Sequence, residues 1–134
     1  MRIDIEYIKD FLEIVLDIDQ PDFTFDHEKI KPLWESEEKL KNFAFHIEIL
    51  EDQDLIVNTV SDKGSINRAG GIHLRINPMR LTADGHQFAS DLNKPGISEK
   101  LATSFKEAGP KEVVKIVFDL GKKALEKKIS ELTE

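Results

Sequence analysis

Basic side chains are the residues of this sequence best suited to chemistry, and they form two local clusters. The first comprises Lys63, Arg68, Arg75 and Arg80, in the middle of the chain. The second is rich in lysine and lies near the C-terminus, within residues 122–128. Lysine and arginine bind phosphate groups, and such contacts supply most of the sequence-independent affinity of a protein for DNA. The clusters therefore predict local basic surfaces suited to a polyanion.

The net charge of the whole chain opposes that chemistry. It is −7 at pH 7, and the acidic residues are concentrated within residues 1–54. Because an acidic surface repels a polyanion, non-specific attraction to nucleic acid is disfavoured. Nucleic-acid binding would depend on how the charges are distributed rather than on their total.

Patterns typical of enzymes and metal sites are weak. The chain has no cysteine, which excludes disulfides, thiolate metal ligands and cysteine nucleophiles. The four histidines, at positions 27, 46, 73 and 86, lack the His-Glu-x-x-His spacing of a helical zinc site. Gly70 and Gly71 are not followed by the Gly-Lys-Ser/Thr ending of a phosphate-binding loop. We therefore expect no enzymatic activity, no metal and no cofactor.

The clearest helical pattern occupies residues 36–50. Ser36 is a suitable N-cap, and apolar residues follow it at three- and four-residue intervals. These residues are Leu40, Phe43, Ala44, Ile47 and Leu50. Strands are predicted over 55–60, which is rich in β-branched residues, and over 72–76, where apolar and polar residues alternate. The polar loop 62–71 joins them into a hairpin that we expect to end at Pro78.

Further helices are predicted on both sides of this unit. An amphipathic helix with an acidic outer face spans about Asp4 to Asp17. A brief extended segment at 23–25 and a short helix capped by Asp26 follow it. After the hairpin, two helices are expected, the first capped by Thr82 and the second by Ser98.

A last helix is predicted from about Lys111 to Leu132. Its apolar positions form two adjacent stripes: Val113, Val117, Leu120 and Ala124 beside Val114, Phe118, Leu125, Ile129 and Leu132. A face that wide predicts packing against the rest of the domain and against something else. We expect a second subunit, so that the protein is a homodimer.

The bulk properties are those of one compact domain with an appended C-terminal segment. Of the 134 residues, 40% are hydrophobic and 34% are charged, as in ordinary globular proteins. We expect a domain over residues 1–95 and a helical extension over residues 96–134, packed on that domain or used for dimerisation. The N-terminus lacks the features of a secretory signal and no apolar run reaches membrane-spanning length, so a cytoplasmic protein without membrane contact is expected.

The order of helix, short helix, longer helix, strand, loop and strand resembles a winged helix-turn-helix. The segment from Arg80 to Phe88 resembles the leucine-threonine-x-x-glycine-x-x-phenylalanine signature that follows the wing in many small winged-helix proteins. More narrowly, the chain from about Leu40 to its C-terminus is similar to a family of small bacterial and phage proteins known only as a domain of unknown function. The resemblance implies an α+β, mainly helical fold with a two-stranded wing and additional C-terminal helices.

The same resemblance implies where DNA would bind. In DNA-binding winged helices the third helix enters the major groove and the wing touches the backbone. The helix positions expected to be exposed are Glu38, Lys39, Lys41, Asn42, Phe45, His46 and Ile49. Those suited to phosphates or base edges are Lys39, Lys41, Asn42 and His46, joined by Lys63, Asn67, Arg68 and Arg75 of the wing.

Two hypotheses about function remain. The first is a small DNA-binding protein of the transcription-regulator type, with double-stranded DNA as its partner. The second is an adaptor that uses the winged-helix scaffold to bind another protein, because Phe45 and Ile49 on the nominal recognition face suit a protein better than a phosphate.

Overall fold

The computed structural model of the protein describes residues 1–133 and is α+β and mainly helical. Its α-helices are α1 (Ile5–Asp17), α2 (Glu37–Asp52), α3 (Ala83–Leu92), α4 (Ile97–Ser104) and α5 (Pro110–Thr133), with a 3-10 turn η1 (Lys31–Leu33). Its short strands are β1 (Ile56–Asn58), β2 (Ile66–Asn67), β3 (His73–Leu74) and β4 (Met79–Leu81). The coarse fold class predicted from the sequence is therefore confirmed.

The two amphipathic helices predicted in the first half of the chain are confirmed, as is the predicted cap Ser36. The Asp4 carboxylate accepts a hydrogen bond from the backbone N–H of Tyr7, which satisfies the first turn of α1. The Ser36 hydroxyl accepts one from the N–H of Lys39 and begins α2 in the same manner. The helix predicted after Asp26 is shorter than expected, because only the 3-10 turn η1 forms there.

The predicted pairing of the strands is wrong. β1 pairs antiparallel with β4, with Ile56 opposite Leu81, and not with residues 72–76. Pro78 therefore precedes a strand instead of ending one. Burial explains the choice: Met79 and Leu81 point into the core on either side of exposed Arg80, so this segment offers the sheet a regular apolar face.

Phe23 pairs with the other edge of β4. Its N–H donates to the carbonyl of Met79, and the N–H of Met79 donates to the carbonyl of Phe23, at 2.8 and 2.7 Å. β4 thus lies between β1 and the extended residue Phe23. The predicted extended segment at 23–25 is realised as this single bridge.

A long loop, residues 59–78, connects β1 to β4. It carries its own two-stranded ladder, in which β2 pairs with β3, so the predicted loop 62–71 contains a strand. At its base, both the N–H and the hydroxyl of Thr59 donate to the carbonyl of Pro78, each at 2.9 Å. We refer to this segment as the 59–78 loop.

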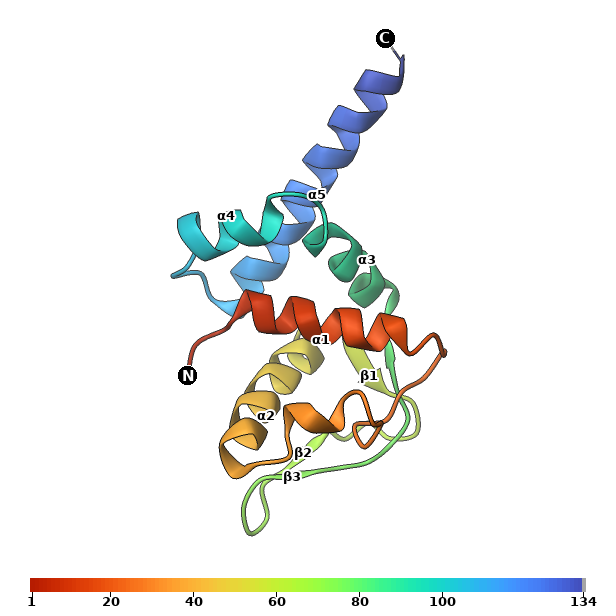
Figure 1. Ribbon diagram of the computed structural model, residues 1–134, viewed down its shortest axis with the longest axis vertical. Helices are drawn as coiled ribbons and strands as arrows, with labels where there is room; N and C mark the ends of the chain where they lie inside the picture. Colours follow the sequence, from red (N-terminus) through yellow and green to blue (C-terminus); the bar gives the residue numbers. More distant parts are fainter. Residues whose placement is uncertain (134) are drawn as a thin grey trace.

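Helix α1 crosses the middle of the molecule (Figure 1). Helix α2, the 3-10 turn and the strands lie on one side of it, and α3, α4 and α5 lie on the other. One continuous core joins the two sides. Its centre is a set of phenylalanines packed edge to face: Phe11, Phe23, Phe25 and Phe43.

In the segment from Arg80 to Phe88, which resembles the winged-helix signature, the structure explains why threonine and glycine occur at positions 82 and 85. The Thr82 hydroxyl donates to the carbonyl of Asp54 and accepts from the N–H of Gly85, so it joins the end of α2 to the start of α3. A Cβ at Gly85 would lie 2.0 Å from the carbonyl oxygen of Leu55. Only glycine allows α3 to approach the backbone this closely.

A second glycine fixes α5 against α3. Lys94 Nζ lies 2.7 Å from the buried carboxylate of Asp91 and also donates to the carbonyl of Gly121. Gln87 donates to the same carboxylate oxygen at 3.0 Å. A Cβ at Gly121 would lie 2.2 Å from the Asp91 carboxyl carbon, so the carboxylate occupies the space that any other residue would fill.

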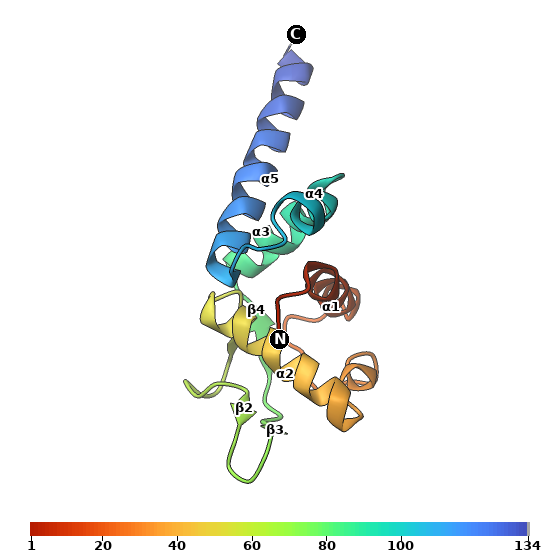
Figure 2. The same ribbon diagram turned by 90° about the vertical axis from the view of Figure 1, so that its left-hand side faces the viewer.

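Beyond Gly121, α5 leaves the body of the protein. Residues 122–133, which we call the stem, project away from the other helices (Figures 1 and 2). Every residue of the stem is exposed, including Leu125, Ile129 and Leu132.

Candidate nucleic-acid interface

The predicted binding residues of α2 divide between two faces of the helix. Residues two positions apart on a helix point in different directions, so exposed Lys39 and exposed Lys41 do not form one patch. Lys41 lies on the side that also carries Glu48, and its ammonium group is 4.0 Å from the carboxylate of Glu37. Lys39 lies on the side of His46. The helix therefore presents isolated lysines rather than a basic strip.

His46 is buried, with 2% of its surface exposed, so the exposure expected of it is wrong. The backbone N–H of Asp4 donates to His46 Nε2 at 2.9 Å. The other ring nitrogen, Nδ1, lies 2.9 Å from the carbonyl of Asn42. Because Nε2 accepts and a carbonyl can only accept, the proton resides on Nδ1. His46 joins α2 to the start of α1 and cannot reach a base edge.

The surroundings of His46 keep its ring neutral. Burial lowers the pKa of His46 below its ordinary value, and the bond to the Asn42 carbonyl and the nearby Asp4 carboxylate offset this only in part. The ring of Tyr7 packs against it with centroids 4.6 Å apart, and Phe45 approaches edge-on at 5.0 Å. Burial also raises the pKa of Tyr7 to about 12, with a smaller contribution from Asp4.

The apolar positions of the nominal recognition face are also covered. Ile49, expected to be exposed, is buried with 8% of its surface accessible. Phe45 is half-buried against His46. Asn42 is half-buried as well. The outer surface of α2 thus consists mainly of charged side chains of both signs, and it includes exposed Glu37 and Glu38.

In the 59–78 loop, Arg68 is bound to α2. Its guanidinium makes a two-point ion pair with the Glu48 carboxylate, and one of these bonds, Nη1 to Oε2, measures 2.7 Å. These hydrogen bonds raise the pKa of Arg68. The Arg68 side chain is 63% exposed, so water and solutes reach the pair freely. A basic residue predicted to contact phosphate is therefore already paired with a carboxylate.

Arg75 and Asn67 hold the loop together. Arg75 Nη1 donates to the carbonyl of Gly64 at 2.6 Å and to that of Ile66 at 3.3 Å. The Asn67 side-chain oxygen accepts from the N–H of Ala69 at 3.0 Å. Both residues therefore shape the turn, whereas Lys63 is exposed on the surface of the loop.

A partly buried contact that we did not predict from the sequence fixes the loop on α2. The N–H of Ser65 donates to the carboxylate of Glu51 at 3.1 Å, and the Ser65 hydroxyl donates to the same group at 3.2 Å. Burial raises the pKa of Glu51, and the bonds from Ser65 act in the opposite direction. Glu51 lies in the acidic run 51–54, which is typical of a helix end. Nothing in the local sequence distinguishes Glu51 from the other acidic residues of this run. Its role follows only from the fold.

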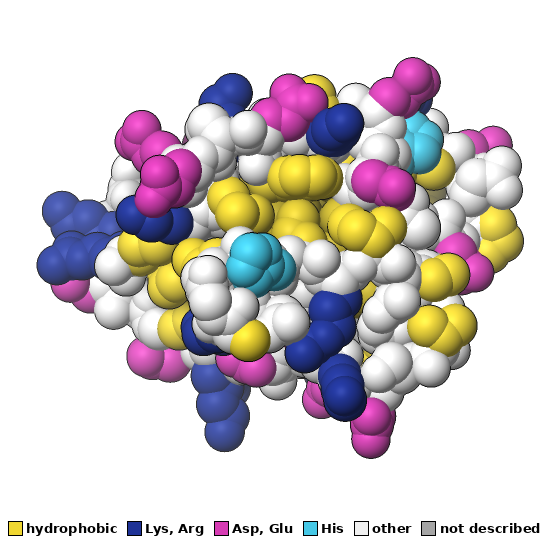
Figure 3. Space-filling view, turned by 90° about the horizontal axis from the view of Figure 1, so that it is seen from below, with side chains coloured by type: hydrophobic (Ala, Val, Ile, Leu, Met, Phe, Trp, Pro, Cys, Tyr) yellow, Lys and Arg dark blue, Asp and Glu magenta, His cyan; other side chains and the backbone are white. Residues whose placement is uncertain are grey.

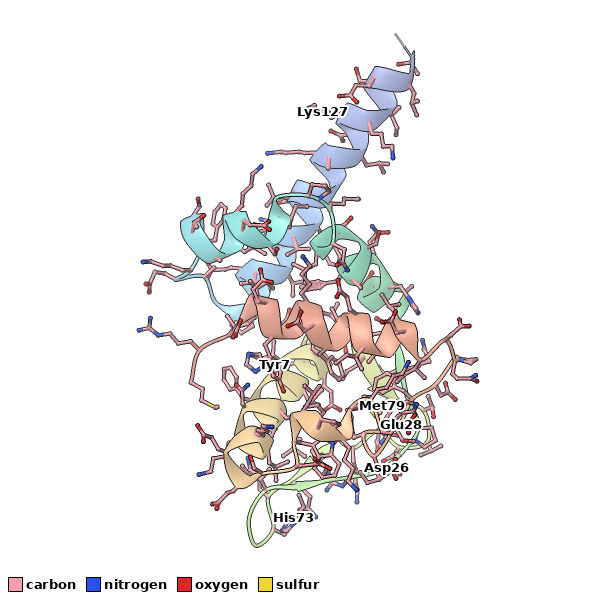
Figure 4. The ribbon with its side chains drawn as sticks, viewed as in Figure 1. Tyr7, Asp26, Glu28, His73, Met79 and Lys127 are labelled. Atoms are coloured by element: carbon pink, nitrogen blue, oxygen red, sulfur yellow. The ribbon has the colours of Figure 1, made fainter. Side chains whose placement is uncertain are left out.

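The end of the molecule that carries the 59–78 loop has a mixed surface. Lysine and arginine side chains on this face alternate with aspartate and glutamate around an apolar centre (Figure 3). His73 lies at this end, opposite the stem that carries Lys127 (Figure 4). Among residues 1–133, no group of three or more histidines and carboxylates is arranged to hold a metal ion. The charged and apolar side chains on this face are suited to reversible binding of charged or apolar groups.

Comparison of the chain with models of protein families, with curated proteins and with solved structures found no match. Within the described part of the chain, none of the helices is both long and apolar enough to cross a membrane.

Proposed function

We propose that this protein is a small winged-helix DNA-binding protein of the transcription-regulator type. The observation that carries the proposal is the order of the strands. Helix α2 leads directly into β1, the 59–78 loop follows, and β4 returns between β1 and Phe23. This succession of helix, strand, long loop and returning strand resembles the outline of a winged helix, and in our proposal the 59–78 loop takes the place of the wing. The proposal requires no catalytic group, metal or cofactor, and it places the protein in the cytoplasm.

The residues that would contact DNA are fewer than the sequence suggests. Lys63 and Arg68 on the loop, with Lys39 and Lys41 on α2, are exposed. Arg68 would exchange Glu48 for a phosphate. An exposed ion pair contributes little to stability, so breaking the pair with Glu48 costs little free energy. The contacts would position the protein on the phosphate backbone rather than read bases, because the outer face of α2 lacks arginine.

A salt titration with a short duplex tests the proposal. We expect affinity that falls with rising salt, and we expect Lys63→Ala with Arg68→Ala to lower the magnitude of the slope by about 2, since each phosphate contact contributes about 0.9. Lys123→Ala with Lys127→Ala, which removes the same charge from the stem, is the matched control. Undetectable binding at low salt, or an equal slope for the loop variant and the wild type, would contradict the proposal.

A protein-interaction adaptor is the second candidate. It is favoured by two apolar side chains of the 59–78 loop, Val60 and Ile76, which are 66% and 45% exposed. A protein partner can bury such side chains, whereas a phosphate backbone cannot. If a partner binds the wild type and the Lys63→Ala, Arg68→Ala variant equally but is lost with Val60→Asp and Ile76→Asp, the adaptor is the better description.

A further inference from the structure

An open cavity of about 360 Å³ lies between α3 and α5, and we call it the α3–α5 cavity. It is found where the stem begins beside α3 (Figures 1 and 2). Small-molecule sites occupy roughly 300–1,000 Å³, so this cavity is at the low end of the range and suits a small ligand. Its wall on α3 is polar, and its wall on α5 is mainly apolar.

The polar wall contains a buried carboxylate that has used only one of its two oxygens. Asp91 is 3% exposed, and its Oδ1 accepts hydrogen bonds from Lys94 Nζ at 2.7 Å and from Gln87 Nε2 at 3.0 Å. Its Oδ2 receives no hydrogen bond from residues 1–133, yet it keeps some contact with solvent. Burying a carboxylate is costly unless donors satisfy it. A donor that enters the cavity would complete its hydrogen bonding.

The cavity also carries one exposed charge of each sign. Asp84 lies two turns before Asp91 on the same face of α3, and Lys122 lies on the opposite wall. Within residues 1–133, no ion pair involves Asp84 or Lys122. Because Lys94 already balances the charge of Asp91, the two remaining charges are equal and opposite. A ligand that carries both signs and no net charge therefore fits best.

The apolar wall has Phe118 and Leu125 on either side of Gly121. Phe118 is held in place by Phe88 of α3, with ring centroids 6.0 Å apart, whereas Leu125 is 51% exposed. A Cβ at Gly121 would lie 2.6 Å from Oδ2 of Asp91, so any other side chain would cover the oxygen that has no partner. The glycine thus brings the carboxylate to the surface between two apolar side chains.

We propose that the α3–α5 cavity binds an α-amino acid with an apolar side chain. The ammonium group donates to Oδ2 of Asp91 and pairs with Asp84, and the carboxylate of the ligand pairs with Lys122. The side chain of the ligand covers Phe118 and Leu125. An amine alone would leave the charge of Lys122 unmatched, and a carboxylic acid alone would be repelled by the two aspartates. The site does not depend on DNA binding.

An NMR titration of the ¹⁵N-labelled protein tests the proposal, with L-leucine and L-phenylalanine as probes. We expect at least one of them to shift the backbone amide signals of the α3–α5 cavity with a dissociation constant of about 1 mM or below. N-acetyl-L-leucine lacks the ammonium group and L-leucinamide lacks the carboxylate, so each should bind at least about 5-fold more weakly than L-leucine. No shift with either amino acid at about 20 mM would overturn the proposal. Equal affinity for L-leucine and either analogue would also overturn it.

Two pairs of variants locate the site. Asp84→Asn and Lys122→Gln should each weaken binding by about 5-fold or more, because each removes one of the two unpaired charges. Asp119→Asn and Lys123→Gln make the same charge changes at exposed positions of α5 that do not line the cavity, so they should bind like the wild type. All four residues are exposed, and unchanged thermal melting would show that folding is intact. If the cavity variants bind as tightly as the controls, the ligand is not held in this cavity.

Discussion

Arg68 of the 59–78 loop and Glu48 of α2 form a two-point ion pair on the surface of the protein. The pair joins the two elements that a winged-helix protein would use to contact DNA. It also places a carboxylate where a phosphate would be expected. Any nucleic acid that binds Arg68 must therefore compete with the protein's own side chain.

The first prediction concerns this competition. Glu48→Gln removes the negative charge beside Arg68, so affinity for a duplex should rise by roughly 2- to 10-fold at low salt, an effect that salt screens. Fluorescence anisotropy with a labelled duplex measures the change. Glu13→Gln, which makes the same charge change at an exposed position of α1, is the control. Equal gains for the two variants would mean that only net charge matters.

The second prediction concerns pH. The pKa of His46 is lower in the folded protein than in the unfolded chain. The unfolded chain therefore binds more protons just below pH 6.5, and stability falls as pH decreases from about 6.5 through the folded pKa, by at most about 1.4 kcal/mol per pH unit for one proton. Denaturant melts of the wild type and His46→Gln at a series of pH values measure this contribution.

Between pH 7 and pH 5, the stability of His46→Gln should depend on pH less steeply than that of the wild type, because the ring that the fold keeps neutral is absent. Identical dependence for His46→Gln and the wild type would show that the ring is not held neutral by the fold.

The third prediction concerns Gly85. In Gly85→Ala the new methyl group would overlap the carbonyl oxygen of Leu55, so α3 must move away from β1. We expect a loss of about 1–3 kcal/mol in the free energy of unfolding, as for overpacked sites in cores. Gly64→Ala is the control, because its nearest atoms lie 4.0 Å away, and it should change stability by less than about 0.5 kcal/mol. Chemical denaturation distinguishes the two outcomes.

The fourth prediction concerns the buried carboxylate of Asp91. Asp91→Ala leaves Lys94 without its carboxylate in a half-buried position, so we expect a loss of about 1–3 kcal/mol in the free energy of unfolding. Denaturant melts measure it. Asp84→Ala, at an exposed position in the first turn of the same helix, should cost less than about 1 kcal/mol. If both variants are equally stable, the contact between Asp91 and Lys94 does not help to fix α5.

Local patterns predicted most of the helices but not the strand pairing. The cap Ser36 is visible in the sequence because a helix start depends on neighbouring residues alone. The partner of β1 depends on which distant segment buries its alternate residues. Residues 72–76 and 79–81 both alternate, and only the complete core favours β4.

The candidate site was less predictable than the fold. Residue type indicated that Lys63 and Arg68 could bind phosphate, and both are exposed. The same reasoning failed for His46, because its ring completes the hydrogen bonding at the start of α1, a helix far away in the sequence. The contact between Glu51 and Ser65 could not be predicted from the sequence either, since neither residue belongs to a motif.

Gly121 fixes the angle between α5 and α3. Because the carboxylate of Asp91 fills the space beside this glycine, α5 can neither rotate by one residue nor slide along α3 without a clash. The direction of the stem is thereby tied to the body that carries the 59–78 loop. A molecule bound to the stem would therefore be held at a fixed distance from the 59–78 loop, with no flexible linker between the two.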